Sequence, residues 1–167
     1  MDGGVWIEYY FGLHYYNDRS VKIQSIKVFF SSARLRKHRI TAFHSVKNYL
    51  WVGYRASGLE RYSIHTNDTA QFRQHAHHRI SSDAITTILT LTSGETLVGT
   101  YGGGLNILTT TEVVQFKGDG NLNPERVLAI LQDSDNSVWI GSESGFYKFD
   151  LERYKYLKVP LETGNSI

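Results

Sequence analysis

The 167-residue sequence contains no cysteine and only two prolines. The absence of cysteine excludes disulfides, thiolate catalysis, iron–sulfur clusters and zinc sites built from cysteine, but it fits a reducing and an oxidising compartment equally well. No stretch approaches the roughly eighteen uncharged apolar residues of a membrane span. The first residues also lack the basic start and apolar core of a signal peptide. The sequence therefore predicts no membrane contact and no leader within this chain.

Charge of one sign is also scarce. Eighteen Lys and Arg stand against sixteen Asp and Glu, which leaves a formal net charge of +2. That balance is far below the basic footprint of a dedicated nucleic-acid binder. The basic run Arg34-Leu35-Arg36-Lys37-His38-Arg39 is interpreted as a charged loop that discourages sheet-edge pairing. We therefore expect no nucleic-acid partner.

Residues that favour strands are abundant. Val, Ile, Thr, Tyr, Phe and Trp make up about a third of the chain, and fifteen glycines supply residues for tight turns. This composition predicts an all-β protein with many short strands.

A four-part repeat organises the chain. Leu50-Trp51-Val52-Gly53 recurs as Thr96-Leu97-Val98-Gly99 and as Val138-Trp139-Ile140-Gly141, and Val5-Trp6-Ile7 is a fourth copy. The intervals between the anchors Trp6, Trp51, Leu97 and Trp139 are 45, 46 and 42 residues. Such intervals are typical of propeller blades of four strands. An apolar segment begins eleven or twelve residues before each of the last three anchors, at Ile40-Thr41, Ile85-Thr86 and Val127-Leu128. We call the first residue of each segment the apolar opening of its repeat.

The second repeat shows the strands of one blade most clearly. It predicts strands over 40–46, 49–53, 59–64 and 71–73, with no room for a helix. Turn residues at 47–48, 93–95 and 133–136 make the first two strands of each repeat antiparallel neighbours. Small sheets must stack face to face to bury their surfaces, and the anchor tryptophans are expected between neighbouring blades.

The predicted fold is an all-β, partial β-propeller of about four four-stranded antiparallel blades in one domain, 1–167. The blades cover 1–39 (incomplete), 40–84, 85–126 and 127–160, and 161–167 opens a further blade. Both ends are expected to fall in mid-blade. Exposed edges and faces predict self-association, with two copies giving a ring of about eight blades, or contact with further blades of a longer parent chain.

These repeats resemble the Trp-Ile/Val-Gly-Thr repeats of regulator propellers. The resemblance rests on Leu50-Trp51-Val52-Gly53, on Thr100 with Gly103-Gly104-Leu105, and on the acidic lead-in from Asp133 to Ser142. It implies part of the periplasmic sensor region of a hybrid two-component histidine kinase, as in gut Bacteroidetes, where glycan breakdown products are the usual signals. The resemblance thus implies a non-catalytic sensing module without a cofactor.

The loops that follow the anchor strands open on one face of a propeller, where ligand sites are common. Aromatic rings there can cover the apolar side of a sugar, while Arg or Glu binds its hydroxyls or carboxylate. We therefore expect an oligosaccharide or another small molecule to contact Tyr9, Tyr10, Tyr54, Arg55, Tyr101 and Glu143.

Other motifs are weaker. His75-Ala76-His77-His78-Arg79, with His65 nearby, is interpreted as a solvated loop rather than a metal site. The glycine run Gly99–Gly104 lacks the Gly-Lys-Ser/Thr ending of a phosphate loop. A lyase-type or other enzymatic propeller, or a pure protein-interaction scaffold, remains the alternative to a sensor.

Overall fold

The computed structural model describes residues 39–66, 68–116 and 124–160 in full, and the backbone of three short strands before them. The chain divides into two compact units, 1–39 and 40–167. The N-terminal unit contains an antiparallel sheet in the order β1 (Val5–Tyr9), β2 (Gly12–Tyr16) and β3 (Gln24–Ser25). Since β1 carries the Trp6 anchor, it aligns with the second strand of the other repeats.

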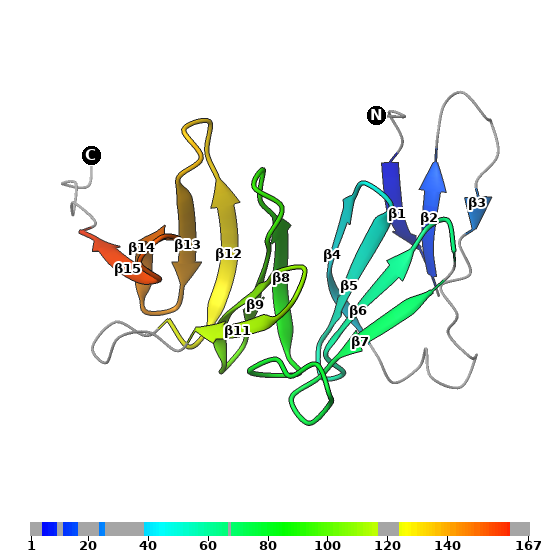
Figure 1. The fold of residues 1–167 in the computed structure, drawn as a ribbon, viewed down its shortest axis with the longest axis horizontal. Coiled ribbons are helices and arrows are strands. Elements are labelled where there is room, and N and C mark those ends of the chain that lie inside the picture. Colours follow the sequence, from blue (N-terminus) through cyan, green and yellow to red (C-terminus); the bar gives the residue numbers. More distant parts are fainter. Residues whose placement is uncertain are drawn as a thin grey trace, which may run out of the picture. The chain divides into compact units, whose positions relative to one another are not determined.

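The C-terminal unit consists of three four-stranded antiparallel sheets that follow one another along the chain (Figure 1). This confirms the predicted all-β propeller architecture, with strand bounds close to those expected. No helix occurs in the described residues, and so none that could cross a membrane. The strands of the first sheet are β4 (Ile40–Val46), β5 (Tyr49–Tyr54), β6 (Leu59–Ser63) and β7 (Thr69–Phe72). The strands of the second sheet are β8 (Ile85–Thr90), β9 (Thr96–Thr100), β10 (Gly104–Leu108) and β11 (Val113–Phe116). The strands of the third sheet are β12 (Val127–Gln132), β13 (Val138–Ser142), β14 (Gly145–Asp150) and β15 (Lys155–Val159).

The turns between the first two strands of each sheet contain a residue with positive φ. These residues are Lys47 at 51°, Gly94 at 109° and Asn136 at 62°. In the first of these turns Lys47, and not the following Asn48, takes the left-handed position. In the third turn Asp133 Oδ1 accepts hydrogen bonds from the N–H groups of Asp135 and Ser137. The acidic lead-in therefore closes its own turn before β13 begins.

The core lies in two layers between the three sheets. The layer between the first and second sheets contains Trp51, Leu59, Ile85, Ile88 and Val98. In the layer between the second and third sheets, the anchor Leu97 is fully buried and meets residues of β12, β13 and β14. Trp51 and Leu97 thus each face the sheet that follows them in the chain. Stacking buries both faces of the middle sheet, as the sequence predicts.

The two anchor tryptophans of this unit differ in burial. Trp51 is 5% exposed, which confirms its expected place between blades. Trp139 is only half-buried, so the prediction that it is largely buried between blades is wrong for this residue. The reason is its position on the face of the third sheet that points away from the second. There it stacks on Phe146 with a centroid separation of 5.3 Å, and its indole N–H donates to Asp133 Oδ2 at 2.6 Å.

Threonine hydroxyls connect the innermost strands of neighbouring sheets. Thr41 Oγ1 donates to the carbonyl of Ile85 at 2.6 Å, and Thr86 Oγ1 donates to the carbonyl of Val127 at 2.5 Å. Thr41 and Thr86 occupy the same place in their repeats, directly after the first apolar residue. These bonds fix the register between sheets at the end of the strands where the candidate site lies.

Candidate functional site

Tyr101, Arg126 and Glu143 form an exposed cluster at one end of the second and third sheets. The Arg126 guanidinium carbon lies 4.5 Å from the centre of the Tyr101 ring, and Arg126 Nη1 lies 2.6 Å from Glu143 Oε2. The side chains of Arg126 and Glu143 are 48% and 45% exposed, and Tyr101 is 46% exposed. The cluster thus presents an aromatic ring, a cation and an anion side by side at the surface.

Backbone hydrogen bonds hold the three residues in place. Tyr101 follows β9 and bridges Arg126, which directly precedes β12. Gly102 and Gly104 donate N–H groups to the carbonyl of Glu125, both at 2.9 Å, and the N–H of Glu143 donates to the carbonyl of Arg126 at 3.3 Å. The loop after β9 and the chain entering β12 are therefore joined, which places residues of two sheets at one point.

The charges in the cluster reinforce one another. The hydrogen bond and the charge of Glu143 raise the pKa of the Arg126 guanidinium above its ordinary value. Arg126 is therefore a permanent cation, and one guanidinium nitrogen engages Glu143 while the group stacks on Tyr101. A guanidinium offers five N–H donors, and a carboxylate accepts several hydrogen bonds, so the pair has capacity left for hydroxyl groups of a ligand.

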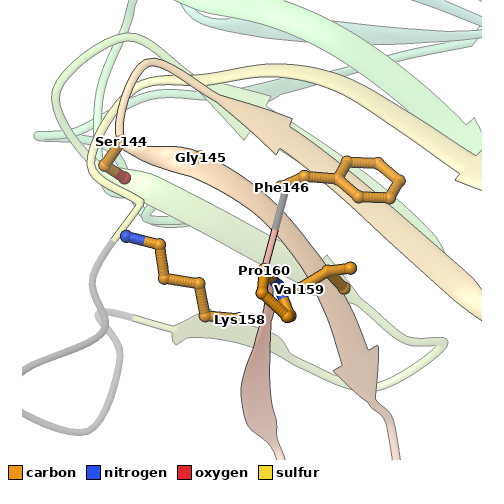
Figure 2. A pocket seen from close by; sticks show the side chains of 6 residues that line it. All are labelled: Ser144, Gly145, Phe146, Lys158, Val159 and Pro160. Carbon is orange, nitrogen blue, oxygen red and sulfur yellow. The ribbon is translucent and has the colours of Figure 1, made fainter. Parts of the chain in front are cut away.

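A shallow groove lies beside the cluster. It begins at Ser144, next to Glu143, and has a volume of about 480 Å³. Figure 2 shows the Lys158 side chain reaching toward Ser144 on one side of the groove, with Phe146 across from it. The hydroxyls of Ser144 and Tyr147 lie 3.0 Å apart. The groove is lined by Ser144, Gly145, Phe146, Lys158, Val159 and Pro160, and so combines an apolar surface with polar groups at one end.

The residues expected from the sequence to form the site are placed differently by the structure. Tyr101 and Glu143 come together through Arg126. Arg55 is exposed at the equivalent position of the first sheet, whereas Tyr54 is 2% exposed and its hydroxyl donates to Glu60 Oε2 at 2.8 Å. Tyr54 therefore does not present its ring at the surface of this unit. Tyr9 ends β1, of which the structure describes the backbone alone, and Tyr10 lies outside the described residues.

Arg126 was missed by the sequence analysis. It lies one residue before the apolar opening Val127, and Arg39 occupies the same place in an earlier repeat. An arginine directly before the apolar opening in two repeats, where the repeat between them has Ala84, was the available signal. The histidine segment shows ring contacts instead of a ligand set: the rings of His77 and His78 lie 5.1 Å apart, and Phe72 packs 5.2 Å from His78. Within the described ranges, no three metal-ligating side chains gather at one point.

A comparison with protein families finds a match over the part of the chain that contains Arg126 and Glu143. Residues 121–144 match the Two component regulator propeller family. The matched segment includes Arg126, the acidic turn, the Trp139 anchor and Glu143. The expected resemblance to regulator propellers is thus confirmed over this segment. A comparison with curated proteins finds no match.

Solved structures support the fold. The extracellular domain of a hybrid two-component system from B. thetaiotaomicron is 21% identical with a TM-score of 0.71, and the match covers 92% of this chain and 21% of that chain. A second two-component extracellular domain from the same organism is 17% identical with a TM-score of 0.73, covering 93% of this chain and 20% of that one. A streptogramin B lyase is 14% identical with a TM-score of 0.72, covering 98% of this chain and 53% of the lyase.

These similarities establish a β-propeller fold. The chain spans about a fifth of the length of the two extracellular domains and about half of the lyase. Both sensor and lyase propellers share the architecture, so the fold does not decide between them. The choice depends on the site.

Proposed function

We propose that this chain is a non-catalytic, ligand-sensing part of a periplasmic two-component sensor. The proposal is supported by the match of residues 121–144 to regulator propellers and by the similarity to extracellular domains of such systems. In this proposal the ligand is a small oligosaccharide released by glycan breakdown. The histidine kinase that would transmit the signal belongs to a longer parent chain or to a partner.

The observation that carries the proposal is the cluster of Tyr101, Arg126 and Glu143 beside the groove at Ser144. The Tyr101 ring offers an apolar surface to the C–H side of a sugar ring, and the ion pair offers donors and acceptors to its hydroxyls. The groove at Phe146 and Lys158 extends the contact to a second sugar. Tyr101 and Glu143 are thereby retained from the expected set, and Arg126 takes the role expected of Arg55.

The proposed site does not perform a reaction. Its one carboxylate with a close basic partner, Glu143, accepts a hydrogen bond from Arg126 Nη1 at 2.6 Å, which engages one carboxylate oxygen in an ion pair. A general acid for glycosidic cleavage requires a raised carboxyl pKa and a second carboxylate at a defined separation. The arrangement therefore suits binding of sugar hydroxyls and release of the ligand unchanged.

Titration of a panel of oligosaccharides followed by amide NMR and calorimetry tests the proposal. Tyr101→Ala and Arg126→Ala should each weaken binding about tenfold or more, since each removes a central contact. Matched controls are Tyr154→Ala, an exposed tyrosine in the turn before β15, and Arg153→Ala, whose salt bridge to Asp150 lies in the same turn. Both controls should bind normally. Amide shifts centred on the turns at 47–48, 93–95 and 133–136 would refute the proposed location, and turnover of a bound sugar would refute the absence of catalysis.

A further inference from the structure

The third sheet has one face that no other described sheet covers, which we name the open face. By strand alternation it carries Trp139 and Gly141 of β13, and Leu131 is paired directly with Trp139. Leu131 is 61% exposed and Leu157 is 56% exposed. By the same alternation the open face consists of Ala129, Leu131, Trp139, Gly141, Phe146, Lys148, Leu157 and Val159, so that it is apolar apart from Lys148.

The equivalent face of the first sheet shows how such a surface is filled. A Cβ placed on Gly53 would lie 2.4 Å from Ile85 Cγ2, so Ile85 packs directly on the backbone of β5. Gly53 is paired with Ala42, which borders the same core layer. In the second sheet a Cβ on Gly99 would lie 2.6 Å from Val127 Cγ1. In both cases the first aliphatic residue of the next innermost strand occupies the space above the glycine.

The third sheet repeats this arrangement without a described occupant. Gly141 is paired with Ala129, as Gly53 is paired with Ala42. Among the described residues, only the Ala129 Cβ comes within 4 Å of a Cβ placed on Gly141, at an ordinary contact distance of 3.8 Å. Two small residues thus leave room at the end of the open face away from Lys148. Glycine weakens a strand interior, and in the first two sheets it stands where a residue of the next innermost strand approaches closely.

We propose that the segment 161–167 fills this space, with Ile167 seated on Gly141 and Ala129 as Ile85 is seated on Gly53. The spacing of the repeat selects Ile167: the openings Ile40, Ile85 and Val127 are 45 and 42 residues apart, and Ile167 follows Val127 by 40. Ile167 is also a β-branched aliphatic residue, the type that occupies both described seats.

The chain is long enough to make this contact. Ile167 follows Val159, the last residue of the outermost strand β15, by eight residues, which can span about 26 Å. Crossing from the outermost to the innermost strand of a four-stranded sheet takes about 14 Å, and the next layer lies about 10 Å away. In the first sheet the corresponding segment, from Phe72 to Ile85, makes the same crossing.

A disulfide experiment tests the seat, because the native chain contains no cysteine. In the double variant Ala129→Cys with Ile167→Cys, an intramolecular disulfide should form in dilute protein at least about tenfold faster than in the control Lys155→Cys with Ile167→Cys. Lys155 begins β15 and therefore lies at the opposite end of the sheet from Gly141. Equal rates in the two variants would overturn the proposal. Disulfides that link two molecules would assign the seat to a second copy instead.

A second measurement does not depend on crosslinking. The single cysteine in Ala129→Cys should react slowly with a thiol reagent in an otherwise native chain. Adding Ile167→Asp should increase the labelling rate several-fold, whereas adding Ile167→Val should leave it unchanged, because valine fills the equivalent seat at Gly99. If Ile167→Asp leaves the labelling rate unchanged, Ile167 does not cover Ala129 and the proposal fails.

Discussion

At the residue scale, a buried network of hydroxyls explains why Tyr54 is not part of the exposed cluster. Tyr54 and Tyr62 both donate their hydroxyl hydrogens to Glu60 Oε2, and Gln71 Nε2 donates to Glu60 Oε1 at 3.0 Å. The two rings are only 2% and 9% exposed. Burial, together with the neighbouring Glu60 carboxylate, raises the pKa of Tyr54 and of Tyr62 above the ordinary value. Ionisation of either hydroxyl would remove a donor and place two negative charges together.

This network predicts loss of stability in alkaline solution. In the unfolded chain the tyrosines ionise near pH 10, whereas in the folded chain their pKa is higher. The unfolded state therefore binds fewer protons above pH 10, and unfolding becomes more favourable as the pH rises. Each of the two tyrosines should lower the free energy of unfolding by about 1.4 kcal/mol per pH unit in that range.

Urea unfolding between pH 8 and pH 11 measures the effect. The double variant Tyr54→Phe with Tyr62→Phe should show a shallower loss of stability above about pH 10 than the parent, while Tyr154→Phe, which alters a 40% exposed tyrosine, should follow the parent curve. An unchanged slope in the double variant would show that these hydroxyls ionise equally in both states.

A substitution at Gly53 tests how closely the first and second sheets approach each other at Ile85. In Gly53→Ala the new methyl group would overlap Ile85 Cγ2 at 2.4 Å, so we expect a loss of about 1–3 kcal/mol in the free energy of unfolding. Adding Ile85→Ala removes the overlapping group, and the double variant should lose less than the sum of the two single losses. Strictly additive losses in chemical denaturation would contradict direct packing of Ile85 on Gly53.

At the element scale, the strands and their stacking could be predicted from the sequence. The face of the sheet to which each side chain near a strand end points was not predicted correctly for Tyr54. The anchors Trp51, Leu97 and Trp139 recur at the same spacing as the apolar openings and the turns. This spacing predicts four short strands per repeat, as the structure has them. Alternation along β5 places Trp51 and Gly53 on one face and Tyr54 on the other, where it is buried. Counting that alternation from Trp51 would have separated Tyr54 from Arg55. The pairing of Arg126 with Glu143 joins two parts of the chain 17 residues apart, and only folding brings them together.

The two tryptophans also show a pairing across strands that the sequence alone does not reveal. Trp51 lies opposite Arg61, whose guanidinium carbon is 5.5 Å from the indole ring, and Trp139 lies opposite Lys148, whose Nζ is 5.6 Å from the ring. In the second sheet Leu97 lies opposite Ile107, so the cation is absent where the aromatic ring is absent. Each cation covers its tryptophan with a charged head group that stays near water.

The difference in tryptophan burial predicts different costs of truncation. Trp51→Ala should lower the free energy of unfolding by about 3–5 kcal/mol, because it opens a cavity between two sheets. Trp139→Ala should cost less, about 1–2 kcal/mol, because part of the ring already contacts solvent. Urea denaturation of the two variants compares these losses directly, and circular dichroism should show no helical signal in either. Equal losses would mean that the open face is covered in solution as fully as the face at Trp51.

At the scale of the whole molecule, the three described sheets form a stack in which each interface repeats the one before it. Trp51 and Leu97 face the following sheet, and the Thr41 and Thr86 hydroxyls donate to the carbonyls of Ile85 and Val127. Repeats that contact mainly their neighbours contribute stability in proportion to the number of interfaces. On the open face the outer strands of the third sheet have no described interface of this kind, although Phe146 occupies the place of Leu59 and Leu105, which are fully buried.

This asymmetry predicts that the chain associates with itself. A seat for Ile167 at Gly141 covers the part of the open face near Ala129, and it leaves Leu131, Trp139 and Leu157, with Lys148 between the last two, for a second molecule. Exposed apolar surface of this kind is normally covered in soluble proteins, and a second copy supplies a cover of matching chemistry. Light scattering from micromolar to millimolar concentration should therefore show a mass that rises above the 19.0 kDa of one chain.

Leu157→Lys separates this association from the seat at Gly141. A charge on β15 should weaken association about tenfold or more while the rate of disulfide formation between Ala129→Cys and Ile167→Cys stays unchanged, because Leu157 lies two strands away from Gly141. Lys155→Leu, which removes a charge from the same strand at its exposed first position, serves as the control and should not weaken association. A species of 19.0 kDa that persists over the whole concentration range would show that the outer strands need no cover and that the stack is stable alone.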